Sequence, residues 1–221
     1  MISAGFFTAL IENPELPIRQ KIESAIFRRI LIGIAMGSTA FYIFTSPFGK
    51  KSGAHINPAV SIVQYRLGNL DLADTIFYIL FQFIGGIAGM YLIYMLFPNR
   101  IADPSVNYIV TQPGVCGVSI AFFAEFLISF LLILVVLFTG EDEHFRGVTN
   151  YFVAGLIVLY VTFEAPLSGF SMNPARTFAS SVISNQWQSC WIYYVAPLLG
   201  MLAGQMIYSY QLKIKLTKVN K

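Results

Sequence analysis

Charged side chains are scarce in this sequence. They make up 11% of its 221 residues, and 14 Lys and Arg against 11 Asp and Glu leave a formal net charge of +3. Soluble domains carry about 25% charged residues, which they need for a surface that faces water. A charge this small and dispersed also cannot follow a phosphate backbone. The scarcity therefore argues against a disordered chain, an ordinary cytosolic enzyme and any nucleic-acid partner.

Cysteines and catalytic motifs are also sparse. Cys116 and Cys190 are the two cysteines and form no CxxC pair, so neither a disulfide framework nor a zinc site is indicated, and no cofactor is expected. The sequence has no HExxH, no GxSxG and no paired aspartates within an apolar run, so a membrane protease or lipid-processing enzyme has no candidate machinery. These absences predict a protein that is not an enzyme.

Long uncharged runs are what the sequence has instead. A membrane-spanning helix needs roughly 20 apolar residues, because it rises about 1.5 Å per residue through a core about 30 Å thick. The runs are continuously apolar, unlike the alternating strands of a membrane barrel or the striped helices of a soluble bundle. They predict an all-α integral membrane protein in a lipid bilayer, with spans near 30–47, 75–97, 117–139, 148–165 and 190–211.

The first ten residues (MISAGFFTAL) are apolar but only half a span long. They lack the positive n-region and small-residue cleavage site of a signal peptide. A short interfacial segment is an alternative. We favour the second half of a helix whose first half is absent from the sequence.

An internal repeat supports this interpretation. Residues 52–59 (SGAHINPA) and 168–175 (SGFSMNPA) share Ser, Gly, Asn, Pro and Ala at equivalent positions. Three predicted spans separate the copies, and an odd number of crossings turns the second copy upside down relative to the first, as in inverted-repeat transporters and channels. We therefore expect one domain, 1–221, with repeats of about 1–97 and 117–211. The expected fold is a six-span bundle whose first span is truncated, and symmetry predicts that the natural chain starts upstream of Met1.

The two Asn-Pro-Ala motifs predict two short, re-entrant half-helices. Asn is a strong helix N-cap, and Pro fits the first helical turn. Irregular backbone at membrane depth survives where it is buried in protein or lines a polar cavity. Two such helices meeting end to end would direct their positive dipole ends and two amide donors at one point, which repels cations and binds a neutral oxygen. The motif residues are Asn57, Pro58 and Ala59, and Asn173, Pro174 and Ala175.

One arginine and three supporting residues surround these motifs. Arg176 follows the second motif in an uncharged region, where a cation marks a pathway; a snorkelling side chain is the alternative. It also argues against an ion-coupled transporter, which would need acidic or hydroxyl-lined cation sites there. Glu125 is expected to accept hydrogen bonds from backbone N–H groups of a re-entrant loop, rather than to relay protons. Glu164 is expected to have a similar supporting role, and His55 to brace its loop rather than bind a metal.

The quoted residues resemble the aquaporin and glycerol-facilitator family, the major intrinsic proteins. SGAHINPAV, SGFSMNPAR, FYILFQFIGGIAG, AFFAEFLISFLL and APLSGFSMNPARTFASS all resemble family segments, in the expected order. The resemblance implies an hourglass pore in each protomer of a homotetramer, with Asn57 and Asn173 at its centre. It also implies an outer constriction at Arg176 and Phe170, with Met36 or Gly37 from the second span and Val161 or Thr162 from the fifth.

The resemblance leaves the solute open. Thr177 stands where glycerol facilitators usually have Asp, and Tyr193 and Tyr194 stand near their Pro, which favours the water-selective branch. Gly37 or Thr162 would instead make a wider constriction, so glycerol or another small neutral solute is the alternative. The family's first-span Glu has no match in residues 1–10. A chain that truly began at Met1 could therefore be a non-conducting structural membrane protein.

The distribution of Lys and Arg predicts the orientation. Cytoplasmic loops carry the excess of these residues. The side that bears the C-terminus has eight and the opposite side five, so we expect a cytoplasmic C-terminus, with a bacterial inner membrane as the location. The eight are Lys50, Lys51, Arg66, Arg146, Lys213, Lys215, Lys218 and Lys221.

Overall fold

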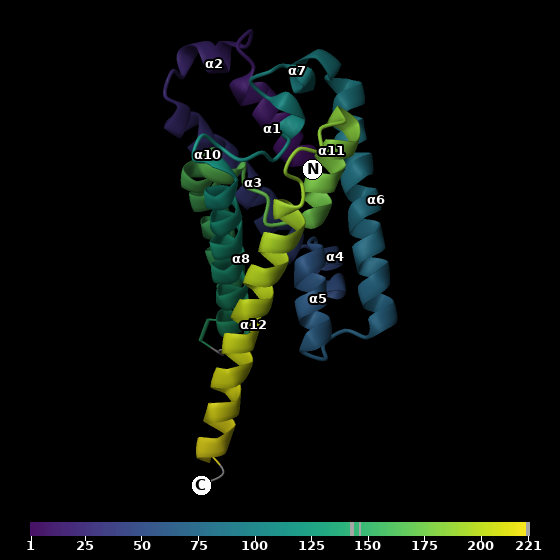
Figure 1. Ribbon diagram of the computed structural model, residues 1–221, viewed down its shortest axis with the longest axis vertical. Helices are drawn as coiled ribbons and strands as arrows, with labels where there is room; N and C mark the ends of the chain where they lie inside the picture. Colours follow the sequence, from purple (N-terminus) through teal and green to yellow (C-terminus); the bar gives the residue numbers. More distant parts are fainter. Residues whose placement is uncertain (142–143, 146, 220–221) are drawn as a thin grey trace.

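The computed structural model describes residues 1–141, 144–145 and 147–219, and within these ranges every regular element is helical. The bundle contains both long and short helices (Figure 1). The elements are α1 (Ile2–Glu12), α2 (Pro17–Lys21), α3 (Ala25–Thr45), α4 (Pro47–Ser52), α5 (Pro58–Arg66), α6 (Leu72–Leu96), α7 (Pro98–Ala102), η1 (Asn107–Ile109), α8 (Gly117–Glu141), α9 (Thr149–Leu159), the π-helical turn η2 (Tyr160–Glu164), α10 (Ala165–Ser168), α11 (Pro174–Ser184) and α12 (Ile192–Val219).

Four helical stretches of the described chain are long and apolar enough to cross a membrane: α3, α6, α8 and the continuous run Thr149–Ser168. Helix α12 is a fifth long helix, and α1 is a shorter apolar one. Large apolar side chains on the outside of the bundle, such as Phe77 and Phe81 of α6, are exposed. An outward apolar surface is stable in lipid, which is as apolar as these side chains. The chain is an integral membrane protein.

The helices match the predicted spans but differ at some ends. Helix α3 begins before residue 30 because Ser24 caps it, accepting from the Phe27 N–H at 3.3 Å. The helix can include Arg28 because Glu12 neutralises its guanidinium. Arg28 Nε lies 3.0 Å from Glu12 Oε2. Helix α12 continues beyond residue 211 to Val219. Arg146 and Lys221, two of the residues behind the predicted orientation, lie outside the described residues.

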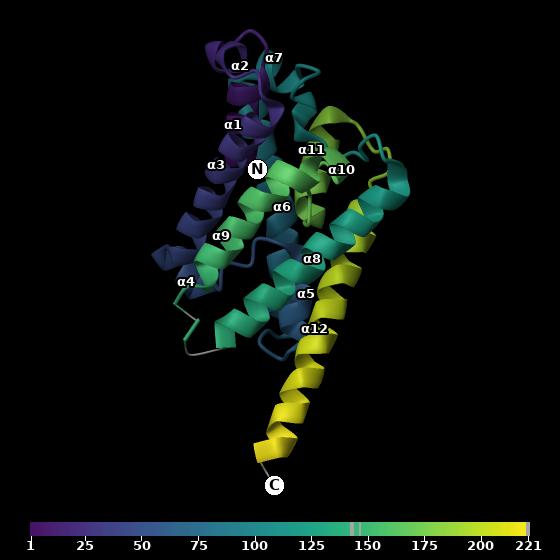
Figure 2. The same ribbon diagram turned by 90° about the vertical axis from the view of Figure 1, so that its left-hand side faces the viewer.

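Two helix pairs form the wall of the bundle, α3 with α9 and α8 with α12 (Figure 2). Each pair approaches closely at glycine. A Cβ at Gly37 would lie 2.8 Å from the Ala154 carbonyl oxygen of α9, and one at Gly200 would lie 2.2 Å from the Phe126 carbonyl oxygen of α8. Small residues at such contacts let helix backbones pack directly on each other.

The half-helices α5 and α11 lie inside this wall, beside α6 (Figure 1). Pro58 and Pro174 occupy their first turns, and Asn57 and Asn173 are their N-caps. The Asn57 side chain accepts from the Ala59 N–H, and the Asn173 side chain accepts from the Ala175 N–H, both at 3.0 Å. Neither half-helix is long enough to span a bilayer, so each must begin within the bundle.

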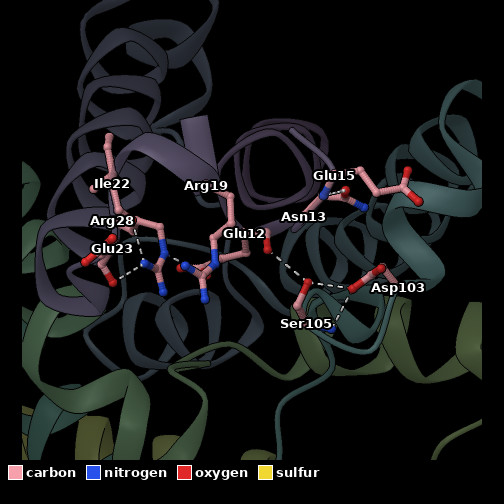
Figure 3. Close-up of polar contacts among 9 residues, drawn as sticks. All are labelled: Glu12, Asn13, Glu15, Arg19, Ile22, Glu23, Arg28, Asp103 and Ser105. Atoms are coloured by element: carbon pink, nitrogen blue, oxygen red, sulfur yellow. Dashed lines mark hydrogen bonds and ion pairs between the residues drawn. The ribbon is translucent and has the colours of Figure 1, made fainter. Parts of the chain in front are cut away.

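A polar network ties the loops together at the upper end in Figure 1, around the end of α1 (Figure 3). Arg28 is only 4% exposed, and besides Glu12 it donates to the carbonyls of Ile22 and Glu23, both at 2.7 Å. The Ser105 hydroxyl reaches the Glu12 carbonyl at 2.9 Å and the Asp103 carboxylate at 2.6 Å. These bonds connect the end of α1 with the beginning of α3 and with the loop that follows α7.

Candidate functional site

The two half-helices meet through a reciprocal pair of hydrogen bonds. Asn57 Nδ2 donates to the carbonyl of Met172, and Asn173 Nδ2 donates to the carbonyl of Ile56, both at 2.7 Å. Each amide therefore contacts the residue that precedes the other asparagine. The structure brings the two motifs together, although most of the chain separates them in sequence.

The hydrogen-bond pattern of these amides shows what they can still bind. Each Oδ1 already accepts from its own helix: Asn57 from Ala59, and Asn173 from the N–H groups of Ala175 and Arg176. Each Nδ2 carries two hydrogens and donates one of them to a carbonyl. What remains at the junction are one amide hydrogen on each asparagine, a second lone pair on each of the two carbonyls, and two positive helix ends. This arrangement suits an oxygen acceptor on a neutral molecule and disfavours a cation.

Arg176 lies in the first turn of α11, three residues after the N-cap Asn173. Its Nη1 donates to the carbonyl of Ile109 at 3.1 Å, and its buried Nε has no partner within the described residues. The guanidinium thus keeps donors and a fixed charge beside the asparagine junction. Val60 follows the first motif as Arg176 follows the second, so this charge stands beside the second motif alone.

Glu125 of α8 holds the loop that leads into the second motif. Its side chain is fully buried and accepts the N–H groups of Ser171 and Met172, each at 2.7 Å. The Ser168 hydroxyl lies 2.6 Å from the same carboxylate and also contacts Glu164. Because Met172 carries the carbonyl that binds Asn57, Glu125 positions an acceptor of the central junction.

His55 is attached through its backbone rather than its ring. Gln82 Nε2 donates to the His55 carbonyl and, at 3.0 Å, to the Ser61 hydroxyl of α5. The imidazole packs against the Tyr78 ring at a centroid distance of 5.2 Å, and its buried Nδ1 has no hydrogen-bond partner in the described chain. The loop before the first motif is thus held against α6.

Comparison with known families agrees with this architecture. The model of the major intrinsic proteins matches residues 2–208, nearly the whole chain. This chain belongs to the major intrinsic protein family. The resemblance read from the two motifs is confirmed.

Individual members of the family are similar over most of the chain. It is 32% identical to Aquaporin NIP6-1 of Arabidopsis thaliana over 95% of this chain and 64% of that protein. It is 29% identical to Aquaporin-4 of Homo sapiens over 82% of this chain and 56% of that protein. The chain thus spans less than two thirds of the length of these relatives. The solved aquaglyceroporin from Plasmodium falciparum has the same fold, with a TM-score of 0.77 at 22% identity, covering 94% of this chain and 89% of that one.

The positions that the family resemblance assigns to an outer constriction differ in their surroundings. Phe170, Val161 and Met36 pack in one apolar cluster, with the Phe170 ring 6.3 Å from that of Tyr160. Gly37 instead packs against α9. Thr162 is buried in η2, where its hydroxyl donates to the Val158 carbonyl and its own carbonyl accepts from Arg29 Nε at 2.9 Å. Met36 and Val161 belong to the same apolar cluster as Phe170, and the choice within each alternative pair stays a prediction.

Two contributors to the site were not predicted from the sequence. Ile109 acts through its backbone carbonyl, which any residue type supplies, so no side-chain pattern marks it. Ser168 stands in the Ser-Gly pair of the second motif, and that repeat was the signal that could have identified it. The corresponding Ser52 in the first motif has its carbonyl 2.6 Å from the Tyr78 hydroxyl.

Proposed function

We propose that this chain is a passive membrane channel that conducts water and excludes protons and other ions. The reciprocal contact of Asn57 and Asn173 carries the proposal, because it leaves N–H donors and two helix dipoles at one point. A passing water can turn its oxygen toward these donors, while a hydrated cation meets positive potential. The family and the aquaporin relatives support the same function.

We further assign the outer constriction to Arg176, Phe170, Met36 and Val161. Arg176 would offer hydrogen bonds and charge, and the apolar cluster would limit the width. Glu125, Glu164 and His55 would hold the backbone of the two motif loops rather than contact the solute.

The test is osmotic shrinkage of liposomes that contain the purified protein. We expect shrinkage faster than in empty vesicles of the same lipid, with an unchanged proton conductance reported by an internal pH dye. Shrinkage at the rate of empty vesicles would reject the channel and leave a structural membrane protein as the alternative.

Glycerol or another small neutral solute is the second candidate. If Gly37 or Thr162 stands at the constriction in place of Met36 or Val161, the passage is wider than a strict water filter. Glycerol uptake, measured on the same vesicles, separates the two functions: uptake well above that of empty vesicles indicates a facilitator, and uptake equal to it indicates a water channel.

We also propose that four copies assemble, each with its own pore, in a bacterial inner membrane with the C-terminus in the cytoplasm. The assembly follows from the family resemblance, and the orientation from the excess of Lys and Arg. Mass measurement of the detergent-extracted complex tests the first, and protease access to a C-terminal tag tests the second.

A further inference from the structure

The carbonyl that holds Arg176 belongs to an unusual turn. Asn107, Tyr108 and Ile109 of η1 have φ values of 44°, 52° and 50°. Residues with a Cβ seldom adopt this left-handed region, and three in succession cost free energy at each position. Such backbone persists only where its surroundings determine it. The neighbours that hold this turn therefore decide where the Ile109 carbonyl points.

One side-chain amide joins the first residue of this turn to a residue that follows the turn. Gln186 Nε2 donates to Asn107 Oδ1 at 2.8 Å, and Gln186 Oε1 accepts from Asn107 Nδ2 at 3.4 Å. The same Oε1 accepts from Gln112 Nε2 at 2.9 Å. Residues 107 and 112 lie on either side of Ile109, so a single amide fixes the segment between them.

The bridge begins directly after the half-helix that carries Arg176. Helix α11 ends at its C-cap Asn185, itself left-handed with φ of 54°, and Gln186 follows directly. Helix α11 therefore carries the Arg176 guanidinium and is followed directly by the Gln186 amide, which orients the carbonyl that accepts from Arg176. The loop cannot shift relative to Arg176 without breaking these hydrogen bonds.

Other contacts place the loop without bridging the turn. The Thr111 and Thr177 hydroxyls lie 2.8 Å apart, both fully buried, and the Tyr108 ring lies 6.2 Å from the ring of Tyr94. Ile109 itself is buried in an apolar cluster. These contacts keep the loop docked if Gln186 is replaced, so its loss should alter the turn rather than unfold the protein.

We propose that Gln186 is a positioning residue for selectivity: it holds the left-handed turn, the turn aims the Ile109 carbonyl, and that carbonyl fixes the Arg176 guanidinium. The proposal rests on the proposed function, since it concerns the constriction of that channel. Without the bridge the turn relaxes, the guanidinium gains freedom, and the constriction admits larger neutral solutes more readily.

The test compares Gln186→Leu with Gln20→Leu in liposomes. Gln20 is an exposed glutamine whose amide donates to the Pro14 carbonyl at 3.2 Å, so it is a matched control. We expect Gln186→Leu to raise the ratio of glycerol to water permeability about three-fold or more, and Gln20→Leu to leave it unchanged. Adding Asn107→Gly to Gln186→Leu should return the ratio toward that of the unaltered protein, because glycine adopts positive φ without strain.

Hydrogen exchange gives a second measurement that needs no conduction. The Ile109 and Val110 amides donate within the turn, each at 2.9 Å, and should exchange about ten-fold faster in Gln186→Leu. Should that variant not fold, Gln112→Leu removes one end of the bridge and takes its place in both assays.

The outcomes are separable. An unchanged permeability ratio, unchanged exchange, or a raised ratio that Asn107→Gly fails to lower would each overturn the role of Gln186. If the unaltered protein conducts no faster than empty vesicles, the proposed channel fails instead, and the exchange rates alone decide whether Gln186 holds the turn.

Discussion

Asn57 and Asn173 hold each other in place: each donates to the carbonyl of the residue before the other, so neither half-helix can withdraw without releasing both. The amides thereby act both as structural links and as the donors left for a solute. Replacing asparagine by aspartate keeps the size of the side chain but removes its hydrogen-bond donor. Comparing this change at the junction and at a surface asparagine tests whether the junction depends on the donor.

Asn57→Asp is expected to weaken both stability and conduction. The aspartate oxygen would face the Met172 carbonyl without a hydrogen, and the junction would lose one of its two amide donors. Leaving buried polar groups unpaired costs about 1–3 kcal/mol, and more for a charge. Thermal unfolding in detergent and osmotic shrinkage of vesicles measure the two effects.

Asn69→Asp is the matched control, because Asn69 is exposed and its side-chain amide donates to the nearby Gln64 rather than to the other motif. We expect it to behave like the unaltered protein. Equal effects of the two substitutions would show that the junction has no special role.

Arg176→Val is expected to make the channel less selective. Valine is the residue that follows the first motif, so the substitution makes the two sides of the junction alike. Loss of the fixed charge should raise leakage of cations and uptake of larger neutral solutes. Arg100→Val controls for the loss of one arginine, since Arg100 is exposed above the Phe97 ring at 5.8 Å. Identical ion leakage in the two variants would place Arg176 away from the conducting path.

The sequence predicts those parts of this molecule that depend on local pattern. The spans follow from apolar runs, and the two half-helices follow from Asn-Pro, whose capping geometry is a property of a few adjacent residues. The inverted arrangement follows from counting spans between the copies. The junction at Asn57 and Asn173 then follows from symmetry.

The rest depends on tertiary contacts that leave no local mark. No sequence pattern marks the Ile109 carbonyl, because every residue type has one. Gln186 lies in a polar loop, and its role becomes evident only from its contacts with residues 107 and 112. The choice between Met36 and Gly37 is undecided from the sequence because adjacent helical residues face different neighbours, and a shift of one residue exchanges them.

Two glycines with the same spacing in the sequence illustrate this point and give a further prediction. Gly85 and Gly200 are each followed by another glycine four residues later, a spacing that lets helix backbones approach closely. A Cβ on Gly200 would lie 2.2 Å from the Phe126 carbonyl oxygen, whereas one on Gly85 would meet nothing within 4 Å. Gly200→Ala should separate α8 from α12 and lower the stability by about 1–3 kcal/mol. Gly85→Ala should change it little or raise it by up to about 1 kcal/mol, because alanine favours the helix. Thermal unfolding of both variants is the measurement, and a larger loss at Gly85 would contradict the packing described.

The two buried glutamates give the last prediction, because the same change should affect them unequally. Ser168 has one hydroxyl hydrogen yet contacts both carboxyl groups, so one contact needs a hydrogen from a glutamate. Both oxygens of Glu125 already accept backbone N–H groups, whereas Glu164 Oε2 has no hydrogen-bond partner in the described chain. We therefore expect Glu164 to be the donor to Ser168.

Glu164→Gln supplies an N–H in the same place and should leave thermal stability and water permeability close to those of the unaltered protein. Glu125→Gln directs an amide NH₂ at a backbone N–H, and the unpaired donors should cost about 1–3 kcal/mol and loosen the loop that carries the Met172 carbonyl. We expect lower unfolding temperature and slower osmotic shrinkage for Glu125→Gln alone. A greater loss in Glu164→Gln than in Glu125→Gln would reverse the assignment of donor and acceptor, and would make Glu164 the carboxylate that holds the loop.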